Sequence, residues 1–425
     1  MLLAYRYLTI FFYPILVLII YFRKILKKEH NKRYKEKIFP SFFNVQKEKS
    51  KKLVWFHAAS VGEVKSILPI VSELNNKNNL SILITTVTLS SGNLISEEIK
   101  KYRNVQHRYF PIDVSFVMKK FLLSWKPDAI FFIDSEIWPN LITLTKQIRI
   151  PIAILNARIT KKTFARWSIA PETAKKIFSC FDLCLTSNNE TKDYLQKFSA
   201  KNIFFHGNIK FINNSILKNE YPNDLSLSQR RFWLASSTHN TEEVLCLKTH
   251  IKLKEKFKKL ITIIAPRHLN RVKDIKTVSE SMGLNTSIID KNDKITDEKE
   301  IFIINYFGAL PKYFRYAKSV FIGKSTIKKL EDVGGQNPIE AVFCGCKIYH
   351  GPYVYNFEEI YDFLQKNKIS KKIRNFDDLA DNLYLDLKET KKKQNNFLPI
   401  INELSNKIFN LTMRDINNFL ANENI

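Results

Sequence analysis

The chain has 425 residues, and its 68 basic residues outnumber the 41 acidic ones, which gives a formal net charge of +27. The length favours two domains over a single core, and the charge favours partners that carry phosphates, either a nucleic acid or an anionic membrane surface. The five cysteines are odd in number and lack the paired Cys-x2-Cys spacing of a zinc site, which argues against both a zinc-stabilised fold and a disulfide-rich secreted domain.

An apolar, aromatic segment opens the chain. Between Met1 and Phe22 the only charged residue is Arg6, and several lysines and arginines follow directly. This run reaches the roughly 20 residues that span a bilayer if the Arg6 side chain extends to the headgroups. The positive charges that follow it predict that the rest of the chain stays on the cytoplasmic side. We therefore predict a membrane anchor over residues 1–22, which spans the membrane or lies in its interface, and a basic juxtamembrane segment over 23–50. The alternative is a buried core helix.

A strand, a tight turn and a helix are predicted between residues 53 and 71. Four apolar residues lead into a turn of small residues, after which apolar residues recur with helical spacing. Ligands of open α/β sheets bind at the carboxyl ends of the strands, and Gly62 allows close approach to the backbone there. Glu63 is therefore a candidate site residue. Its spacing from Ser60 also fits a capping box that only begins the helix.

Short apolar segments alternate with helical patterns along the rest of the chain, as in a sheet buried on both faces. The segments are residues 81–87, 129–133, 150–155 and 203–205 in the first half, and 232–235, 260–265, 301–304, 320–322 and 347–349 in the second. They predict an α/β fold with an N-terminal domain over 51–212, a polar linker over 213–228 and a C-terminal domain over 229–395. A helical stripe within 396–425 suits packing back onto one of the two domains.

Polar residues gather where the predicted strands end. Paired carboxylates at such positions suit proton transfer or the binding of hydroxyl groups, and hydroxyls and cations at a helix start suit phosphate. The candidates beyond Glu63 are Asp134, Glu136, Asn156, Arg158, Asn208 and Lys210 in the first half, and Ser236, Ser237, Thr238, Arg267 and His268 in the second. The same residue types also occur where they only cap a helix or stay solvated as cations. None of these residues alone therefore indicates a functional site.

A glycine-rich stretch over residues 334–340 is the sharpest signal in the second half. Gly334 and Gly335 free the backbone to fold around a ligand, Pro338 suits a first helical turn, and Glu340 can accept two sugar hydroxyls. The stretch has neither the Gly-Lys-Ser/Thr end of a P-loop nor the spacing of a dinucleotide site. A simple capped turn is the alternative.

Six stretches, in order, resemble the motifs of the 3-deoxy-D-manno-octulosonic acid (Kdo) transferase family. They are residues 57–63, 135–140, 155–158, 207–210, 265–268 and 334–340. The resemblance implies a GT-B fold of two Rossmann-like domains with an N-terminal membrane-anchor helix. It also implies an inverting glycosyltransferase of lipopolysaccharide core biosynthesis, which moves Kdo from CMP-Kdo to a lipid A precursor (lipid IVA) at the cytoplasmic face of the bacterial inner membrane. Neither a metal ion nor a cofactor is expected.

The resemblance also implies roles for single residues. Glu63 corresponds to the catalytic base, and Arg267 is expected to contact the CMP phosphate. The site for the acceptor and the sugar is expected to contain Ser60, Gly62, Glu136, Asn156, Arg158 and Lys210. The CMP site is expected to contain Ser236, Ser237, Thr238, Arg267, His268, Gly334, Gly335, Asn337 and Glu340. The expected partners are CMP-Kdo, lipid IVA and inner-membrane lipids, and nucleic acid is not expected because no basic stripe interleaved with aromatics stands out.

The chain departs from the family pattern at three places. Residues 305–310 replace a segment that carries two acids in the family, Lys324 lies in a loop that is richer in glycine there, and Gln336 replaces a histidine. Three alternatives therefore stay open: a GT-B glycosyltransferase that uses a UDP sugar, a basic protein that binds nucleic acid, and a membrane-bound scaffold with a disabled site. The presence of Glu63, Arg267 and Glu340 favours an active enzyme.

Overall fold

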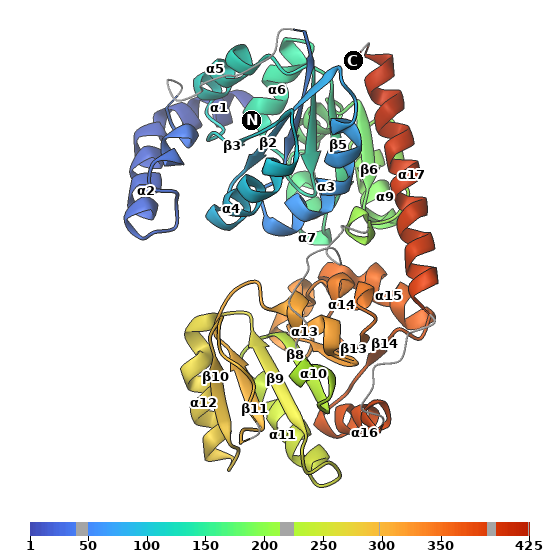
Figure 1. The fold of residues 1–425 in the computed structure, drawn as a ribbon. Helices are drawn as coiled ribbons and strands as arrows, with labels where there is room; N and C mark the ends of the chain where they lie inside the picture. The colour runs from blue at the N-terminus through green and yellow to red at the C-terminus, as the bar shows by residue number, and fades with distance from the viewer. Residues whose placement is uncertain (40–49, 213–224, 297, 389–396, 424) are drawn as a thin grey trace. The chain divides into compact units, whose positions relative to one another are not determined.

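The computed structural model describes residues 1–425 except 40–49, 213–224, 297, 389–396 and 424 (Figure 1). The chain forms two compact units, Met1–Asn214 with Leu404–Ile425 (unit 1) and Ser215–Glu403 (unit 2). Most of the predicted linker over 213–228 lies outside the described residues, and its last four form the short helix α10 (Leu225–Ser228). Each unit contains a seven-stranded sheet in which every pair of neighbouring strands is parallel. The predicted α/β fold with two similar halves is confirmed.

The sheet of unit 1 has the strand order β3-β2-β1-β4-β5-β6-β7. Its strands are β1 (Lys52–His57), β2 (Leu80–Thr86), β3 (Val105–Tyr109), β4 (Ala129–Ile133), β5 (Ile152–Ala157), β6 (Leu183–Thr186) and β7 (Ile203–Phe205). The main helices are α3 (Val61–Asn75), α4 (Leu89–Glu98), α5 (Ser115–Trp125), α6 (Pro139–Gln147), α7 (Lys161–Ser168), α8 (Pro171–Phe178) and α9 (Asn189–Lys197), and short 3-10 turns are η1 (Arg33–Lys37), η3 (Ile99–Lys101) and η4 (Ile209–Phe211).

Apolar side chains fill both faces of this sheet because successive residues of a strand point to opposite sides. Trp55 of β1 and Phe132 of β4 belong to a core cluster with residues of α5, α6 and α8. On the opposite face, Phe131 contacts Phe419 of α17 (Leu398–Asn422), with ring centroids 5.4 Å apart. Residues 404–425 therefore belong to unit 1, and α17 is the red helix in Figure 1.

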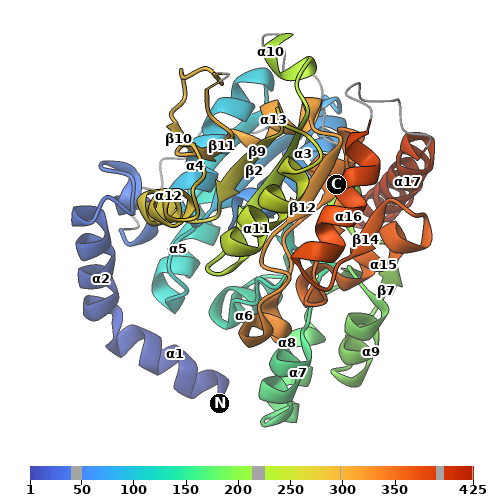
Figure 2. The same ribbon diagram turned by 90° about the horizontal axis from the view of Figure 1, so that it is seen from below.

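The sheet of unit 2 has the strand order β10-β11-β9-β8-β12-β13-β14. Its strands are β8 (Phe232–Thr238), β9 (Ile261–Pro266), β10 (Thr286–Ile289), β11 (Ile301–Ile304), β12 (Ser319–Ile322), β13 (Lys347–His350) and β14 (Ser370–Lys372). Its helices are α11 (Glu242–Lys254), α12 (Val272–Ser281), α13 (Leu310–Tyr316), α14 (Ile339–Phe343), α15 (Glu358–Lys366) and α16 (Phe376–Leu387), with 3-10 turns η6 (Leu269–Arg271), η7 (Lys328–Val333) and η8 (Tyr355–Phe357). Helices α11 and α16 lie side by side and share one core cluster with α12 (Figure 2).

The N-terminal segment forms two helices, α1 (Leu2–Phe11) and α2 (Tyr13–Ile25), where a single anchor helix was predicted. Pro14 lies in the first turn of α2 and has no N–H with which to continue the hydrogen bonds of α1. Among the described residues no single helix has the length and apolarity to cross a membrane, whereas this pair, bent by 59°, has them together.

Helix α1 lies beside α5 and α6 (Figure 1). Both N-terminal helices leave many apolar side chains exposed. The side chains of Leu2, Tyr13 and Leu16 pack against the core of unit 1. The large apolar side chains that stay exposed are Met1, Leu3, Tyr7, Leu8, Ile10, Phe11, Phe12, Ile15, Leu18, Ile19, Tyr21, Phe22, Ile25 and Leu26. A continuous apolar surface of this extent is typical of a binding interface.

Candidate active site

Glu63 lies in the first turn of α3, directly beyond the carboxyl end of β1. Ser60 caps this helix, since its hydroxyl oxygen accepts a hydrogen bond from the Glu63 amide at 3.4 Å. The carboxylate of Glu63 accepts two hydrogen bonds, from the Ala59 amide at 2.8 Å and from the Ser60 hydroxyl at 2.7 Å. The helix cap that the sequence offered as an alternative is therefore present, and it also fixes the carboxylate in place.

The surroundings of Glu63 change its acidity. The pKa of Glu63 is raised to about 7, chiefly by burial and in addition by the negative charges of Asp134 and Glu136, while the hydrogen bonds from Ser60 and Ala59 act in the opposite direction. A carboxylate with a pKa near neutrality can accept a proton efficiently at physiological pH. At Gly62, an added Cβ would find its nearest neighbour only at 4.0 Å, so space remains beside the carboxylate.

Glu136 is the second carboxylate at this edge of the sheet. One of its oxygens accepts a hydrogen bond from the indole N–H of Trp138 at 2.9 Å and lies 3.2 Å from Nε2 of His57. His57 is fully buried, and its Nδ1 lies 3.0 Å from the Thr85 hydroxyl. These contacts fix the orientation of Glu136, whose side chain is 20% exposed.

Asp134, a candidate because of its place at a strand end but one to which the family resemblance gave no role, connects three of the predicted site residues. Its carboxylate forms an ion pair with Lys210 at 2.6 Å and accepts a hydrogen bond from the side-chain amide of Asn156. Its backbone carbonyl accepts a hydrogen bond from the amide of Arg158 at 3.1 Å. Asp134 and Asn156 have φ angles of 58° and 57°. Such left-handed backbone in residues other than glycine costs roughly 1–3 kcal/mol and clusters at functional sites.

The predicted CMP-binding turn at the end of β8 is largely buried. Ser236 and Thr238 are buried, and their carbonyl groups accept hydrogen bonds from the amides of Gly323 at 2.8 Å and Arg267 at 3.0 Å. Ser237 has a φ of 56°. The Thr238 hydroxyl is buried with no hydrogen-bond partner among the described residues. The turn thus joins the ends of three neighbouring strands.

Glu242, at the start of α11, was not predicted as a site residue. Its buried carboxylate accepts hydrogen bonds from the amides of His239 at 2.9 Å, Lys324 at 2.6 Å, Ser325 at 2.9 Å and Thr326 at 3.1 Å, and from the Thr326 hydroxyl at 2.9 Å. Successive amides of a loop form a concavity that binds anions. Here the chain's own carboxylate fills it. The backbone of Lys324 supplies this contact, so the departure of this loop from the glycine-richer loop of the family leaves it intact.

Cationic and imidazole side chains gather around the same loop. Burial lowers the pKa of Lys324, and the positive charge of Arg267 lowers it further. Burial also lowers the pKa of His239, to which the charges of His268 and Lys324 contribute. The rings of His239 and His268 lie 5.5 Å apart. Positive charges held close together favour an anionic ligand. The group comprises the predicted Arg267 and His268 and, in addition, His239 and Lys324, which were not predicted.

The glycine-rich loop is shaped by its own packing. A Cβ on Gly334 would lie 2.3 Å from the carbonyl oxygen of Tyr353, and Gly335 has a φ of 85°, so both positions favour glycine. The side chain of Asn337 accepts a hydrogen bond at 3.0 Å from the amide of Ile339, the first residue of α14, whose first turn contains Glu340. In the part of the chain that the structure describes, no group of three or more His, Cys, Asp and Glu residues could hold a metal ion.

Comparisons with known proteins agree with these observations. Residues 32–213 match a family described as 3-deoxy-D-manno-octulosonic-acid transferase (kdotransferase). A probable mitochondrial 3-deoxy-D-manno-octulosonic acid transferase of Arabidopsis thaliana is 31% identical, with 85% of this chain and 82% of that protein covered. The 3-deoxy-D-manno-octulosonic acid transferase of Rickettsia typhi is 32% identical, with 80% of this chain and 73% of that protein covered.

The fold has relatives among solved structures as well. A glycosyltransferase from Rickettsia africae is 11% identical to the chain and has a TM-score of 0.54, with 87% of this chain and 98% of that chain covered. At this level of identity the likeness concerns the fold alone, and it confirms the predicted GT-B fold.

Proposed function

The chain belongs to the 3-deoxy-D-manno-octulosonic acid (Kdo) transferase family, and we propose that it transfers Kdo from CMP-Kdo to a hydroxyl group of a lipid A precursor. It is a glycosyltransferase, and the main prediction from the sequence is favoured over the UDP-sugar and non-catalytic alternatives. One observation carries the mechanism: Glu63 is a buried carboxylate at the carboxyl edge of a parallel sheet, with a pKa raised to about 7.

In the proposed step, Glu63 is the general base. The acceptor oxygen forms a bond to the anomeric carbon of Kdo, and the bond from that carbon to the CMP phosphate breaks. The phosphate leaves with the electron pair, and the acceptor proton passes to Glu63, so the configuration at the anomeric carbon inverts. The hydrogen bonds from Ala59 and Ser60 hold the carboxylate in one orientation, and Glu136, fixed by Trp138, is placed to bind hydroxyl groups.

Unit 2 supplies the groups for the donor in this proposal. Arg267 and Lys324 offset the negative charge that develops on the departing phosphate, and the neighbouring His239 and His268 add hydrogen-bond donors. Glu340 binds the ribose hydroxyls. The replacement of both family acids within residues 305–310 makes the surroundings of the donor more positive, which suits a ligand that carries a phosphate and the Kdo carboxylate.

We assign the location to the cytoplasmic face of the bacterial inner membrane, with lipid IVA and membrane lipids as partners. The support for this assignment is the apolar surface of α1 and α2, together with the lysines and arginines that follow α2. Apolar side chains on an interfacial helix gain from burial among acyl chains, and adjacent cations gain from anionic headgroups.

The test is turnover of CMP-Kdo with lipid IVA in detergent, with release of CMP and the mass of the lipid product as readouts. Glu63→Gln should lower the rate by roughly 10²-fold or more, because it removes the general base. Glu73→Gln is the matched control, since Glu73 is an exposed residue of the same helix. Turnover of a UDP sugar without CMP release would contradict the proposal and favour the alternative donor.

A further inference from the structure

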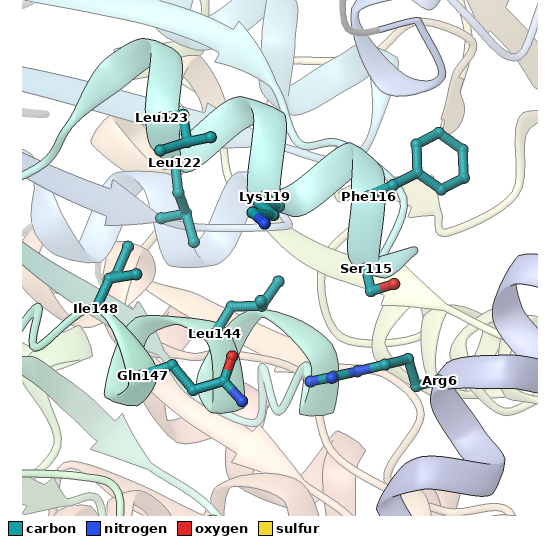
Figure 3. A pocket seen from close by; sticks show the side chains of 9 residues that line it. All are labelled: Arg6, Ser115, Phe116, Lys119, Leu122, Leu123, Leu144, Gln147 and Ile148. Carbon is teal, nitrogen blue, oxygen red and sulfur yellow. The ribbon is translucent and has the colours of Figure 1, made fainter.

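An amphipathic cavity of about 370 Å³ lies between α5 and α6, where α1 reaches across them. Ligand sites in proteins commonly occupy roughly 300–1,000 Å³, so the size is sufficient for part of a small ligand. Figure 3 shows Leu122 of α5, Leu144 of α6 and Ile148 directly after α6 around the space between the two helices, with Arg6 entering from α1. This cavity belongs to unit 1 and contains none of the residues assigned to catalysis.

The cavity combines apolar walls with positive charge. Its apolar residues are Phe116, Leu122, Leu123, Leu144 and Ile148, and its two charged residues, Arg6 and Lys119, are both cations. None of the described residues that line it is acidic, and within the described part of the chain no carboxylate pairs with either cation. Such a lining suits a ligand with a hydrocarbon chain and an anionic head.

The surface next to the cavity indicates where such a ligand comes from. Leu3, Tyr7, Leu8 and Phe11 of α1 are 66%, 68%, 54% and 75% exposed. Helix α1 thus presents Arg6 to the cavity and large apolar residues to its surroundings, which is the pattern of a helix that lies in a membrane interface. At the membrane location proposed above, on which this inference rests, a lipid would reach the cavity without crossing water.

The cavity runs along α5 from Ser115 and Phe116 in its first turn to Leu123 near its C-terminal end, and the latter end lies away from the catalytic carboxylates. Leu123 and Ile148 lie at the C-terminal ends of α5 and α6. Helices that connect parallel strands run opposite to the strands, so these ends lie toward the amino edge of the sheet. Glu63 follows the carboxyl end of β1, at the other edge. A chain between α5 and α6 therefore runs away from the site of transfer.

We propose that this cavity binds one anionic membrane phospholipid, with an acyl chain between α5 and α6 and the phosphate at Arg6 and Lys119. The bound lipid fastens α1 to unit 1. It acts beside two polar contacts that already tie α1 there: the hydroxyl of Tyr5 donates to Asp113 at 3.1 Å, and the side-chain amide of Asn140 donates to the hydroxyl of Thr9 at 3.1 Å. The proposal goes beyond the transfer reaction, because this lipid is neither donor nor acceptor.

Native mass spectrometry of the full chain, released from detergent, tests this proposal directly. Phosphatidylglycerol and phosphatidylcholine with identical acyl chains are added separately at equal concentrations. We expect one phosphatidylglycerol per chain to be retained, at least fivefold more than phosphatidylcholine. Lys119→Gln should lower retention severalfold, whereas Lys120→Gln should not, because Lys120 is the exposed neighbour on α5 that does not line the cavity.

A second pair of variants tests the apolar part. Leu123→Trp fills the cavity and should abolish retention, while Leu385→Trp, at a residue of unit 2 that is 62% exposed, should leave it unchanged. Thermal unfolding shows whether Leu123→Trp has misfolded. If it has, Lys119→Gln still tests the proposal independently, because Lys119 is exposed. Equal retention of both lipids, or retention unaffected by Leu123→Trp, would overturn the proposal. Stoichiometric displacement by lipid IVA would overturn it as well, since the cavity would then be part of the acceptor site.

Discussion

Each unit buries a glutamate at the start of the helix that follows its first strand, and the two glutamates differ in how fully they are hydrogen-bonded. Glu63 of α3 accepts two hydrogen bonds and faces the charges of Asp134 and Glu136, so its pKa is raised to about 7. Glu242 of α11 accepts hydrogen bonds from four amides and one hydroxyl. In unit 2 the glutamate at this position holds a loop in place, whereas for unit 1 we propose that it serves proton transfer.

Substitution of these two residues should therefore have opposite effects on stability. Glu242→Gln keeps one oxygen but turns a donor toward amides that need an acceptor. Each buried donor left unsatisfied costs about 1–3 kcal/mol, so we expect a loss on the order of 3 kcal/mol in urea unfolding followed by a probe in unit 2. The control is Glu255→Gln, because Glu255 is exposed at the end of the same helix. Unchanged stability of Glu242→Gln would break the comparison.

Glu63→Gln should instead gain stability, but only at high pH. The folded pKa of Glu63 is raised from its ordinary value of 4.5 to about 7, so the folded state binds the proton more tightly than the unfolded state. Native stability is therefore highest below pH 4.5 and falls as the pH rises through 7. At about 1.4 kcal/mol per pKa unit, the gain of the variant over the native chain should be on the order of 2–3 kcal/mol larger at pH 8 than at pH 4. Urea unfolding at both values measures it, and a gain that is equal at both would refute the raised pKa.

A smaller effect is expected from Asp134→Asn. The charge of Asp134 raises the pKa of Glu63, so its removal should move the acidic limb of the pH–rate profile to lower pH. In this variant Lys210 loses its ion pair with Asp134. Its positive charge should then also lower the pKa of Glu63. The profile of CMP release against pH shows the shift, with Asp128→Asn as the control because Asp128 lies at the opposite edge of the sheet, before β4. A shift to higher pH would contradict the electrostatic account.

The sequence predicted the strands and motifs whose signals are local. Residues 129–133 match β4 because a continuous apolar run identifies a buried strand. Residues 203–205 match β7, but the predicted burial of this strand was wrong, because β7 lies at the edge of the sheet and Phe204 is 42% exposed. Strand β3 was missed, since it contains Gln106, His107 and Arg108, and burial of His107 depends on contacts with Arg33 and Thr86 far away in the chain. The break between α1 and α2 was also missed, although Pro14 was a visible signal for it.

The candidate site was predictable to the same extent. Glu63 and Glu136 belong to motifs that follow apolar strands, and the structure brings them together with Asp134. Glu242 could not be found in this way, because all of its partners except His239 lie 82–84 residues further along the chain and contact it mainly through backbone amides. No side-chain pattern encodes such a contact. The roles assigned to the residues of both units stay predictions.

The measurement that tests the central claim most directly is the pH dependence of kcat/KM for CMP release between pH 5 and 9, with CMP-Kdo and lipid IVA in detergent. If Glu63 is the general base, activity should rise with pH along a limb whose midpoint lies near 7, where burial places its pKa, and Glu63→Gln should show only a weak residual rate without that limb. A native rate that is already maximal at pH 5, or a limb near 7 that persists in Glu63→Gln, would contradict the account.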